Sequence, residues 1–337
     1  MRRTAPTAPA RPLPPAPRAG SGRPPHPGRP RRADHPERGR PARRCPHGRS
    51  ATGLMATTVA GYRLLALLRR RGCQNVFRAQ GPDGRRAALK TTCQEAAPDV
   101  LARALNEGHG LRAAAPHPYT ADLLDEGFHH GLHYLAVDWQ RGPTLHQLLD
   151  HLDRSMAAWS PGSAEFFLHL ALALCHALDG LHHHGVVHAD LSPRNIVLGH
   201  GRTLALIDLD SCVRQDDPAA GTLNRCATTA YAAPECLAPR PRPVPTGASD
   251  QYSVAAILYR VLQQRHHLPA TADRTRAREV RLSRPPRPVT GWPAVTWPRL
   301  GPTLDRALAP DPADRHPGTG DFTSCLRHAL TLTGERP

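Results

Sequence analysis

The sequence predicts an α+β protein with two lobes, a small β-rich N-terminal lobe and a larger helical C-terminal lobe. Short β-type runs, separated by glycine-bearing turns, fill the chain from residue 60 to 138. From residue 142 onward, apolar residues recur mainly at the three- and four-residue steps of helices. A β-rich part followed by a helical part indicates two lobes that are joined near residues 138–142, with a cleft between them.

The N-terminal lobe is predicted to contain several short strands and one helix. The expected strands are Tyr62–Leu68, Val76–Gln80, Arg86–Thr91, Asp122–Gly127 and His133–Trp139. Turns at Gly72, Gly81 and Gly84 separate the first three strands. Helical character extends over Val100–Ala115, which places the helix between the third strand and the fourth.

The C-terminal lobe is predicted to be mainly helical. Between Phe167 and Leu181 the apolar residues recur at helical spacing. The expected helices are Thr144–Leu152, Ser163–His183, Ala248–Gln264, Thr303–Ala309 and Asp321–Leu330. Two short β-type stretches, Asn195–Leu198 and Thr203–Ile207, lie between the second helix and the third.

Residues 1–54 differ in composition from the rest of the chain. The first 50 residues contain 13 Pro, 13 Arg and no Phe, Trp or Tyr. Such a segment cannot bury enough apolar surface to offset its loss of conformational entropy, so we expect it to be disordered. Met55 follows directly after the change in composition, which makes it an alternative start of translation. We expect the folded domain over residues 60–332, with its lobes at 60–138 and 142–332.

The chain carries a formal net charge of +16, from 44 basic and 28 acidic residues. Thirteen arginines against two acids in the first 50 residues account for +11 of this charge. That segment offers no aromatic side chain on which a base could stack. We therefore interpret it as a linker or a mis-assigned start in preference to a nucleic-acid-binding arm. The rest of the chain is mildly basic, and we expect no nucleic-acid partner.

Two further features concern the location of the protein. The sequence contains no apolar run long enough to cross a membrane, so we expect no membrane span. Its eight cysteines show no C-x-x-C pairing, which in a chain of this length without a secretory segment is typical of reduced thiols. Both features predict a cytoplasmic protein. The sequence carries no signal of its oligomeric state.

One loop carries the residues best suited to chemistry. The stretch His188–Asn195 follows an apolar helix and precedes a β-type run. Within it, the carboxylate of Asp190 could accept a proton from an attacking hydroxyl, and the amide oxygen of Asn195 could ligate a metal. Further on, Asp208 stands in the apolar run Leu204–Leu209, where an acid is costly to bury unless it is paired or binds a cation.

The order and spacing of these three residues resemble the catalytic loop and the metal-binding triplet of the protein kinases. The resemblance covers roughly residues 60–332 and is to the bacterial serine/threonine kinases of eukaryotic type. It implies a protein-kinase-like fold, with Asp190 as the catalytic aspartate. It also implies that Asn195 and Asp208 hold Mg²⁺.

The N-terminal lobe resembles the ATP-binding lobe of the same family, because residues 87–90 match the strand that carries its phosphate-binding lysine. Lys90 is the only lysine among the 44 basic residues, and it falls where a compact ammonium would reach the α- and β-phosphates of ATP. The resemblance further implies that Glu107 pairs with Lys90. It also implies that Asp138 and Gln140 belong to the hinge that holds the adenine.

Three stretches of the C-terminal lobe add to the resemblance. Residues 228–235 match the end of the kinase activation segment, in which Thr228 would face the catalytic aspartate. The resemblance implies that Asp250 braces the catalytic loop through backbone N–H groups. It also implies that Arg315 pairs with Glu235.

The chain departs from the kinase pattern at several positions. The glycine-rich phosphate loop is expected at residues 69–74, but only Gly72 remains there, so backbone N–H groups would approach the phosphates less closely. The arginines of this stretch either compensate by charge or are simply exposed, and we favour exposure. We still place Gly72 and Val76 among the nucleotide-binding residues. Ala189 replaces the arginine that senses a phosphorylated activation segment, and Asp210 replaces the glycine of the metal-binding triplet.

The resemblance as a whole implies an enzyme that transfers the γ-phosphoryl of Mg-ATP to a Ser or Thr hydroxyl of a protein substrate. Two alternatives stay open. One is a pseudokinase that binds ATP as a scaffold, which the degraded phosphate loop favours. The other is a small-molecule phosphotransferase of the aminoglycoside type. Such enzymes share the Asp–Asn–Asp core but resemble the kinases less beyond it, and this counts against the second alternative.

Overall fold

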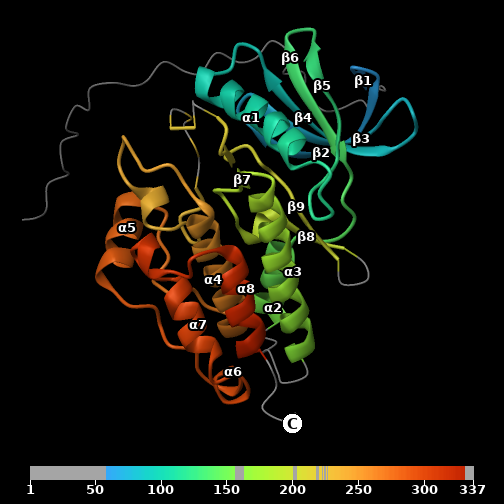
Figure 1. The fold of residues 1–337 in the computed structure, drawn as a ribbon. Coiled ribbons are helices and arrows are strands. Elements are labelled where there is room, and N and C mark those ends of the chain that lie inside the picture. The colour runs from blue at the N-terminus through green and yellow to red at the C-terminus, as the bar shows by residue number, and fades with distance from the viewer. Residues whose placement is uncertain are drawn as a thin grey trace, which may run out of the picture. The chain divides into compact units, whose positions relative to one another are not determined.

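The computed structural model describes residues 58–155, 163–199, 203–217, 220, 221, 223, 225 and 227–330. All of them belong to one unit of the chain, His47–Pro337. The predicted disorder of residues 1–54 and the last residues of the expected domain, 331–332, lie outside the described residues. Within the unit, a β-sheet with one long helix forms the N-terminal lobe, and helices form most of the C-terminal lobe (Figure 1).

The N-terminal lobe is built on a six-stranded antiparallel sheet with the order β1-β2-β3-β4-β6-β5. Its strands are β1 (Thr58–Val59), β2 (Tyr62–Arg71), β3 (Gln74–Gln80), β4 (Arg86–Cys93), β5 (Leu123–His129) and β6 (Leu132–Asp138). Helix α1 (Pro98–Ala114) connects β4 to β5. The expected strands and helix are therefore present, but β2 continues to Arg71, three residues beyond its expected end.

A small separate core holds this sheet together. Its buried members include Tyr62, Leu89 and the alanines Ala79, Ala87 and Ala136. Three alanines with no exposed surface allow close approach of whatever packs over them, because a methyl group fills little volume. This lobe thus depends on a thin layer of small residues, whereas the main hydrophobic core lies largely in the helical lobe.

The C-terminal lobe contains long helices and short strand pairs. Its helices are α2 (Leu145–Ser155), α3 (Ala164–His183), α4 (Gly247–Gln263), α5 (Arg274–Ser283), α6 (Trp292–Thr296), α7 (Leu300–Ala307) and α8 (Thr319–Ala329). Strand β7 (Val186–Val187) pairs with β10 (Val213–Arg214), and β8 (Ile196–Leu198) pairs with β9 (Leu204–Leu206). Short 3₁₀ turns cover Pro193–Asn195, Glu235–Leu237 and Pro312–Asp314.

Five helices of this lobe were expected from the sequence, and α5 and α6 were not. Helix α5 buries only Ala277, Val280 and Arg281, so it lacks the apolar periodicity that marks a helix in a sequence. Helix α6 is a single short turn of five residues. Helix α7 begins at Leu300 instead of the expected Thr303.

Helix α3 is the one described helix whose length and hydropathy would suit a membrane span. In the fold its apolar residues Phe167, Leu174 and Leu178 are buried in the main core. They pack with residues of α4, such as Val254 and Leu258. The apolar character of α3 is therefore used in packing.

Helix α4 positions the loop that follows β7. Its fully buried Asp250 accepts hydrogen bonds from the backbone N–H of His188 at 2.8 Å and of Ala189 at 2.9 Å. The Nε2 of His182 lies 2.9 Å from the same carboxylate. These contacts confirm the bracing predicted for Asp250. They also hold Ala189 at a φ of +64°, a left-handed conformation that a residue with a side chain seldom adopts.

A second buried ion pair fixes the chain that precedes α4. The guanidinium of Arg315, which is 1% exposed, donates to both carboxylate oxygens of Glu235, at 2.8 and 2.9 Å. The hydroxyl of Ser249 donates to Glu235 at 2.8 Å, and Arg315 also donates to the carbonyl of Ala248 at 2.8 Å. A bidentate pair with further hydrogen bonds is the arrangement in which a buried charge is well satisfied. The predicted pairing of Arg315 with Glu235 is confirmed.

The substitution Asp250→Asn tests the bracing of the loop. The amide keeps the volume of the carboxylate but can accept through only one oxygen, so one of the backbone N–H groups loses its partner. We expect the free energy of unfolding in urea to fall by about 3 kcal/mol. The matched control is Asp216→Asn, at a carboxylate that is 90% exposed, which we expect to change stability by less than about 0.5 kcal/mol. Equal stabilities of the two variants would contradict the role of Asp250.

Candidate active site

A cavity of about 560 Å³ is lined by residues of both lobes. The sheet contributes apolar side chains to its wall, among them Val76, Ala88 and Val137, and the helical lobe contributes Val197 and Ile207. Its polar lining includes Arg69, Lys90, Glu107, Asn195 and Asp208. The cavity thus combines apolar walls with a polar cluster, which is the composition of a small-molecule site.

Lys90 lies on β4, between its cross-strand partners Val76 and Leu135. Its Nζ donates to Glu107 Oε1 at 2.6 Å and Oε2 at 2.8 Å, and to Asp208 Oδ1 at 2.6 Å. Three carboxylate oxygens therefore receive the three protons of one ammonium. The contact between Lys90 and Glu107 is the one that the sequence predicted.

This cluster is buried, and its pKa values follow from that. Burial alone would lower the pKa of Lys90, but the carboxylates of Asp208 and Glu107 raise it. Burial raises the pKa of Glu107, and the Lys90 ammonium opposes the rise. Burial would also raise the pKa of Asp208, yet the adjacent ammonium of Lys90 keeps it below its usual value. Lys90 is consequently a fixed positive charge, with Asp208 ionised beside it.

Asp208 and Asn195 reach the cavity from two neighbouring segments. Asp208 follows β9 with a φ of +69°, and Asn195 ends the 3₁₀ turn before β8. The Nδ2 of Asn195 donates to the backbone carbonyl of Asp190 at 2.9 Å, so its amide oxygen is the atom left to bind a ligand. The sequence-predicted metal ligands Asn195 and Asp208 are therefore brought to the same cavity.

This donor set fits Mg²⁺. A carboxylate and an amide oxygen are hard donors, and Mg²⁺ is commonly held by one or two protein oxygens while phosphates and water complete its shell. Within the described residues, no cluster of three or more His, Cys, Asp or Glu side chains is arranged to hold a metal. A closed cage built by the protein is thus not what the described part of the chain offers.

Asp190 lies in the loop between β7 and β8. Its Oδ1 accepts a hydrogen bond from the backbone N–H of Thr228 at 2.7 Å, which places Thr228 beside it as expected. Burial raises the pKa of Asp190 to about 7, and the charges of Asp210 and Asp208 contribute in the same direction. A carboxyl with such a pKa can exchange a proton near neutral pH.

The predicted hinge connects β6 to α2. The backbone N–H of Asp138 donates to Asp122, and that of Trp139 donates to Arg86, at 2.8 and 3.2 Å. The Asp138 carboxylate pairs with Arg85 at 3.1 Å. Asp138 and Gln140, which the resemblance assigns to the hinge that holds the adenine, both line the cavity.

Gly142 closes this connection. Its φ is +135°, and a Cβ there would collide with the backbone carbonyl of Leu198. Only glycine lets the two strands of chain approach so closely. The sequence placed Gly142 in the hinge but gave no reason for it.

The segment predicted as the phosphate loop is a tight hairpin. Strands β2 and β3 stay paired up to Arg71 and Gln74, so Gly72 and Cys73 form a two-residue turn. Gly72 has a φ of +57°, which suits such a turn, and it does not line the cavity that holds Lys90. The predicted nucleotide contact of Gly72 is therefore not supported by the structure, whereas Val76 does line the cavity.

Arg69 occupies the cavity wall near the place left by the missing loop. The pairing of β2 with β3 shifts register between Leu67 and Arg69, and Leu68 and Arg69 both line the cavity. The guanidinium of Arg69 contributes to the low pKa of Asp208. Arg69 is exposed, as expected, and it also lines the cavity that holds Asp208. Counting two residues along β2 would have placed Arg69 and Arg71 on one face and Arg70 on the other.

Helix α1 is tied to the segment after β9 by contacts that the sequence did not reveal. Asn106 donates through Nδ2 to the carbonyls of Asp210 and Cys212, at 3.1 and 3.0 Å. The Asp210 carboxylate lies 3.4 Å from the guanidinium of Arg103. Burial, together with the charge of Asp208, raises the pKa of Asp210. Asp210 is therefore held by α1 as well as lying near Asp208.

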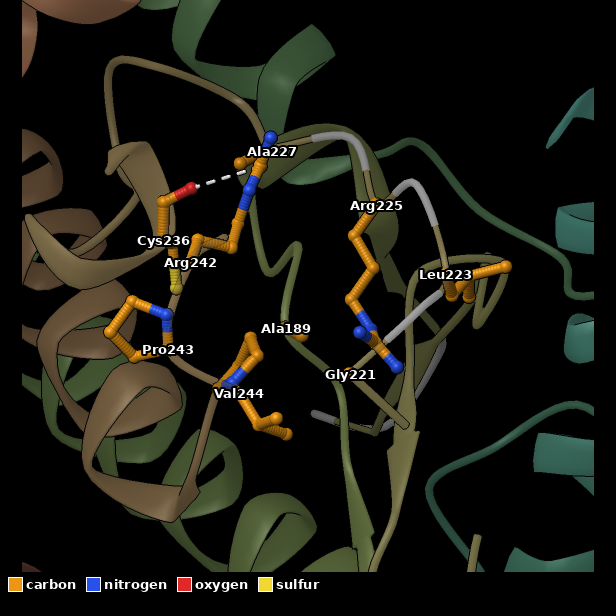
Figure 2. A pocket seen from close by; sticks show the side chains of 10 residues that line it. Ala189, Gly221, Leu223, Arg225, Ala227, Cys236, Arg242, Pro243 and Val244 are labelled. Atoms are coloured by element: carbon orange, nitrogen blue, oxygen red, sulfur yellow. Dashed lines mark hydrogen bonds between the residues drawn. The ribbon is translucent and has the colours of Figure 1, made fainter. Parts of the chain in front are cut away.

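A further pocket lies beside Ala189, and Figure 2 shows its lining side chains. Arg225 and Arg242 enter it from two segments of chain, 221–227 and 236–245. Arg225 donates through Nε to the carbonyl of Ser211 at 3.1 Å. Burial lowers the pKa of Arg225. Position 189 is an alanine, but two arginines from elsewhere in the chain, Arg225 and Arg242, line the pocket beside it.

Comparisons with known proteins agree with this architecture. A family model described as the protein kinase domain matches residues 73–315. The chain is 28% identical over 292 residues to the serine/threonine-protein kinase PknF of Mycobacterium tuberculosis, an alignment covering 83% of this chain and 58% of PknF. It thus spans a little over half the length of this relative.

Two shorter matches point the same way. The DNA damage-responsive serine/threonine-protein kinase RqkA of Deinococcus radiodurans is 34% identical over 61% of this chain and 30% of its own length. The serine/threonine-protein kinase AfsK of Streptomyces coelicolor is 30% identical over 59% of this chain and 24% of its own length. With the family model matched across most of the two-lobed unit, around the cavity that Lys90 and Asp208 share, the chain belongs to the protein kinase family.

Proposed function

We propose that this chain is a protein serine/threonine kinase that transfers the γ-phosphoryl of Mg-ATP to a protein hydroxyl. The observation that carries the proposal is the contact of one ammonium, Lys90, with Glu107 and Asp208 at the polar end of an otherwise apolar cavity. The names of the relatives support the choice of Ser and Thr as acceptors.

The cavity suits a nucleotide. Ala88, Val137 and Val197 offer apolar surfaces to a flat base, and Asp138 and Gln140 of the hinge line the same cavity. The phosphates would then lie toward Lys90. Its compact ammonium suits a phosphate oxygen as a point charge.

Asp208 and Asn195 would hold Mg²⁺ through a carboxylate and an amide oxygen. When bound, the ion would supply positive charge that offsets the negative charge of the phosphates. The contribution of the chain is to keep these two donors in place: Lys90 holds Asp208, and the Asp190 carbonyl holds the Asn195 amide.

Asp190 would orient the acceptor hydroxyl and take its proton. Its carboxyl is held by the Thr228 N–H at 2.7 Å and lines a second cavity that is open enough to admit a side chain. Positioning and charge stabilisation supply most of the catalysis in phosphoryl transfer, so a fixed carboxylate is sufficient for this task.

The alternatives from the sequence are less well supported. A small-molecule phosphotransferase would not need the Glu235–Arg315 pair that fixes the segment beside Asp190, and the family match is to protein kinases. The two-residue turn in place of the phosphate loop keeps the pseudokinase as the alternative to test. We also propose a cytoplasmic location, because Cys175, Cys212 and Cys236 are buried cysteines that form no disulfide, as is typical of a reducing compartment.

The substitution Asp190→Asn separates enzyme from scaffold. We expect incorporation of phosphate from Mg-ATP into a protein or peptide substrate to fall by about 10²–10⁴-fold, because the general base is lost. The assay uses radiolabelled ATP with and without a chelator of Mg²⁺. Equal, near-zero incorporation by the natural chain and the variant, with equal ATP binding, would establish a pseudokinase.

The same variant carries its own folding control. Because the folded-state pKa of Asp190 is raised to about 7, the folded chain favours the neutral acid, and the ionised carboxylate destabilises the fold as pH rises from about 4 to 7. The neutral amide removes this effect. We expect Asp190→Asn to unfold with a free energy higher than that of the natural chain by on the order of 2–4 kcal/mol at pH 8 in the absence of nucleotide. The difference should disappear near pH 4.

The substitution Lys90→Arg tests the demand for a compact ammonium. A guanidinium keeps the charge but is planar and larger, so it cannot give its protons to three carboxylate oxygens at the distances that Lys90 does. We expect kcat to fall by at least about 100-fold while the far-UV circular dichroism stays unchanged. Activity within a factor of about two of the natural chain would show that charge alone suffices.

Arg69→Ala and Arg70→Ala form a matched pair on adjacent positions of β2. Arg69 lines the cavity, whereas Arg70 donates to the side chain of Asn75 on the hairpin. If a guanidinium replaces the glycine-rich loop at the phosphates, Arg69→Ala should raise KM for ATP about tenfold. Arg70→Ala should leave KM within a factor of about two. Equal effects of the two substitutions would remove Arg69 from the nucleotide site.

A further inference from the structure

A second cavity, of about 370 Å³, has Asp190 and Thr228 on its wall. Its lining residues are Arg71, Asp190, Arg225, Ala227, Thr228, Arg242 and Arg274. Four arginines thus surround the proposed acceptor position, while Asp190 is the one acid among these residues. We infer that this cavity binds an anionic side chain of the protein substrate, a carboxylate or a phosphate, close to the acceptor Ser or Thr. This inference rests on the proposed kinase function and adds the substrate class.

The four arginines come from separate parts of the chain. Arg71 ends β2 in the sheet, and Arg225 belongs to the segment after β10. Arg242 lies in the loop before α4, and Arg274 is the first residue of α5. Contributions from four segments make the positive charge a property of the folded site, one that the local sequence around any single arginine does not show.

Two of these arginines donate hydrogen bonds to one backbone carbonyl. Arg274 donates through Nη2 to the carbonyl of Cys236 at 2.6 Å, and Arg242 donates through Nη1 to the same oxygen at 3.4 Å. Figure 2 shows the Arg242 contact beside Ala227. A carbonyl oxygen satisfies a donor but carries no net charge, so this contact leaves the positive charge of the Arg274 guanidinium in the cavity.

Three arginines elsewhere in the chain set a contrast. Arg315 pairs with Glu235, Arg260 with Asp153 and Arg214 with Asp217. Within the part of the chain that the structure describes, no ion pair is formed by Arg71, Arg225 or Arg274. Arg71, Arg225 and Arg274 therefore lack the carboxylate partner that Arg315, Arg260 and Arg214 have.

Electrostatic strain points in the same direction. Burial lowers the pKa of Arg225; the charge of Asp217 opposes this shift, and the positive charge of Arg242 adds to it. Two cations that repel one another across a cavity are stabilised by an anion placed between them. Carboxylates and phosphates are also the groups that match the planar donor fork of a guanidinium.

The position of the cavity limits where the anionic residue lies in the substrate. An extended peptide advances roughly 3.3 Å per residue. With the acceptor hydroxyl at Asp190, only side chains within about three residues of the acceptor can reach this cavity. The arrangement therefore selects acceptors with Asp, Glu or a phosphorylated residue as near neighbours.

A peptide panel tests the inference with the full chain and Mg-ATP. Each peptide carries one Ser or Thr, and the positions up to three residues on either side are occupied in turn by Asp, Glu, phosphoserine, Ala or Arg. The measurement is kcat/KM for phosphate incorporation. We expect the acidic or phosphorylated peptides to exceed the matched Ala peptides by about tenfold at one or more positions, and the Arg peptides to be the poorest.

Substitutions assign the preference to the cavity. Arg71→Gln and Arg274→Gln should each reduce the ratio of kcat/KM between acidic and Ala peptides several-fold, with partial recovery in Arg274→Lys. The matched control is Arg276→Gln on the same helix, whose exposed guanidinium pairs with Glu279 at 3.2 Å. This control removes the same charge and should leave the ratio unchanged. A ratio is used because general structural damage lowers both of its terms.

The outcomes separate this inference from the proposed function. Incorporation into all peptides with no dependence on charge, or a preference for Arg, overturns the inference and leaves the kinase intact. An acidic preference that Arg276→Gln abolishes as strongly as Arg274→Gln also overturns the assignment to this cavity. Absence of incorporation into any peptide or protein removes the kinase function, and the inference with it.

Discussion

The ammonium of Lys90 is the interaction on which the rest of the site depends. It joins β4 to Glu107 on α1 and to Asp208 in the segment after β9, each at 2.6 Å. A buried lysine without partners would be neutral or would destabilise the fold, because desolvating a charge costs several kcal/mol. Two carboxylates balance that cost only if three separate elements are held in fixed positions relative to one another. The remaining contacts of the site keep these elements in place.

Helix α1 holds Glu107 and Asp208 in position relative to each other. Asn106 binds the carbonyls of Asp210 and Cys212, so the helix that presents Glu107 also holds the segment that presents Asp208. The close approach is possible because Gly110 faces Cys212, where a Cβ would come within 2.5 Å of the sulfur. Movement of α1 would therefore disturb both carboxylates that contact Lys90, those of Glu107 and Asp208. Two motifs that are far apart in the sequence are thus coupled in the folded site.

Helix α4 holds the loop that contains Asp190 and Asn195. Ala189 and Asp208 both have positive φ angles, of 64° and 69°, although neither is glycine. Each such conformation costs about 1–3 kcal/mol and persists only where the surroundings impose it. Asp250 imposes it on Ala189 through the adjacent backbone N–H groups, and Lys90 holds the carboxylate of Asp208. These two residues precede and follow Asn195 in the sequence. Ala189 is held by Asp250 of the C-terminal lobe, and Asp208 is held by Lys90 of the N-terminal lobe.

The sequence predicted the parts of this protein that a short stretch of residues determines. Lys90, Asp190, Asn195 and Asp208 stand in local motifs, and the long helices show their apolar period. Helix α5 was missed because few of its residues are apolar, and its stability comes from tertiary packing. The place of Arg69 on the cavity wall was not predicted, because the pairing of β2 with β3 shifts register just before that residue.

The net charge of the chain predicts little about the chemistry of its site. Most of the +16 lies in residues 1–50, so the total describes the composition of that segment more than the domain. The charges that matter for chemistry are few and are brought together by folding: Arg69 beside Asp208, and Arg71 and Arg274 around Asp190. The Coulomb energy between two charges falls with their distance and with the polarity of the medium. Several guanidinium groups around one cavity therefore attract an anion there more strongly than a larger number of arginines exposed to water elsewhere. A basic protein and a basic site are different properties, and only the second can select a substrate.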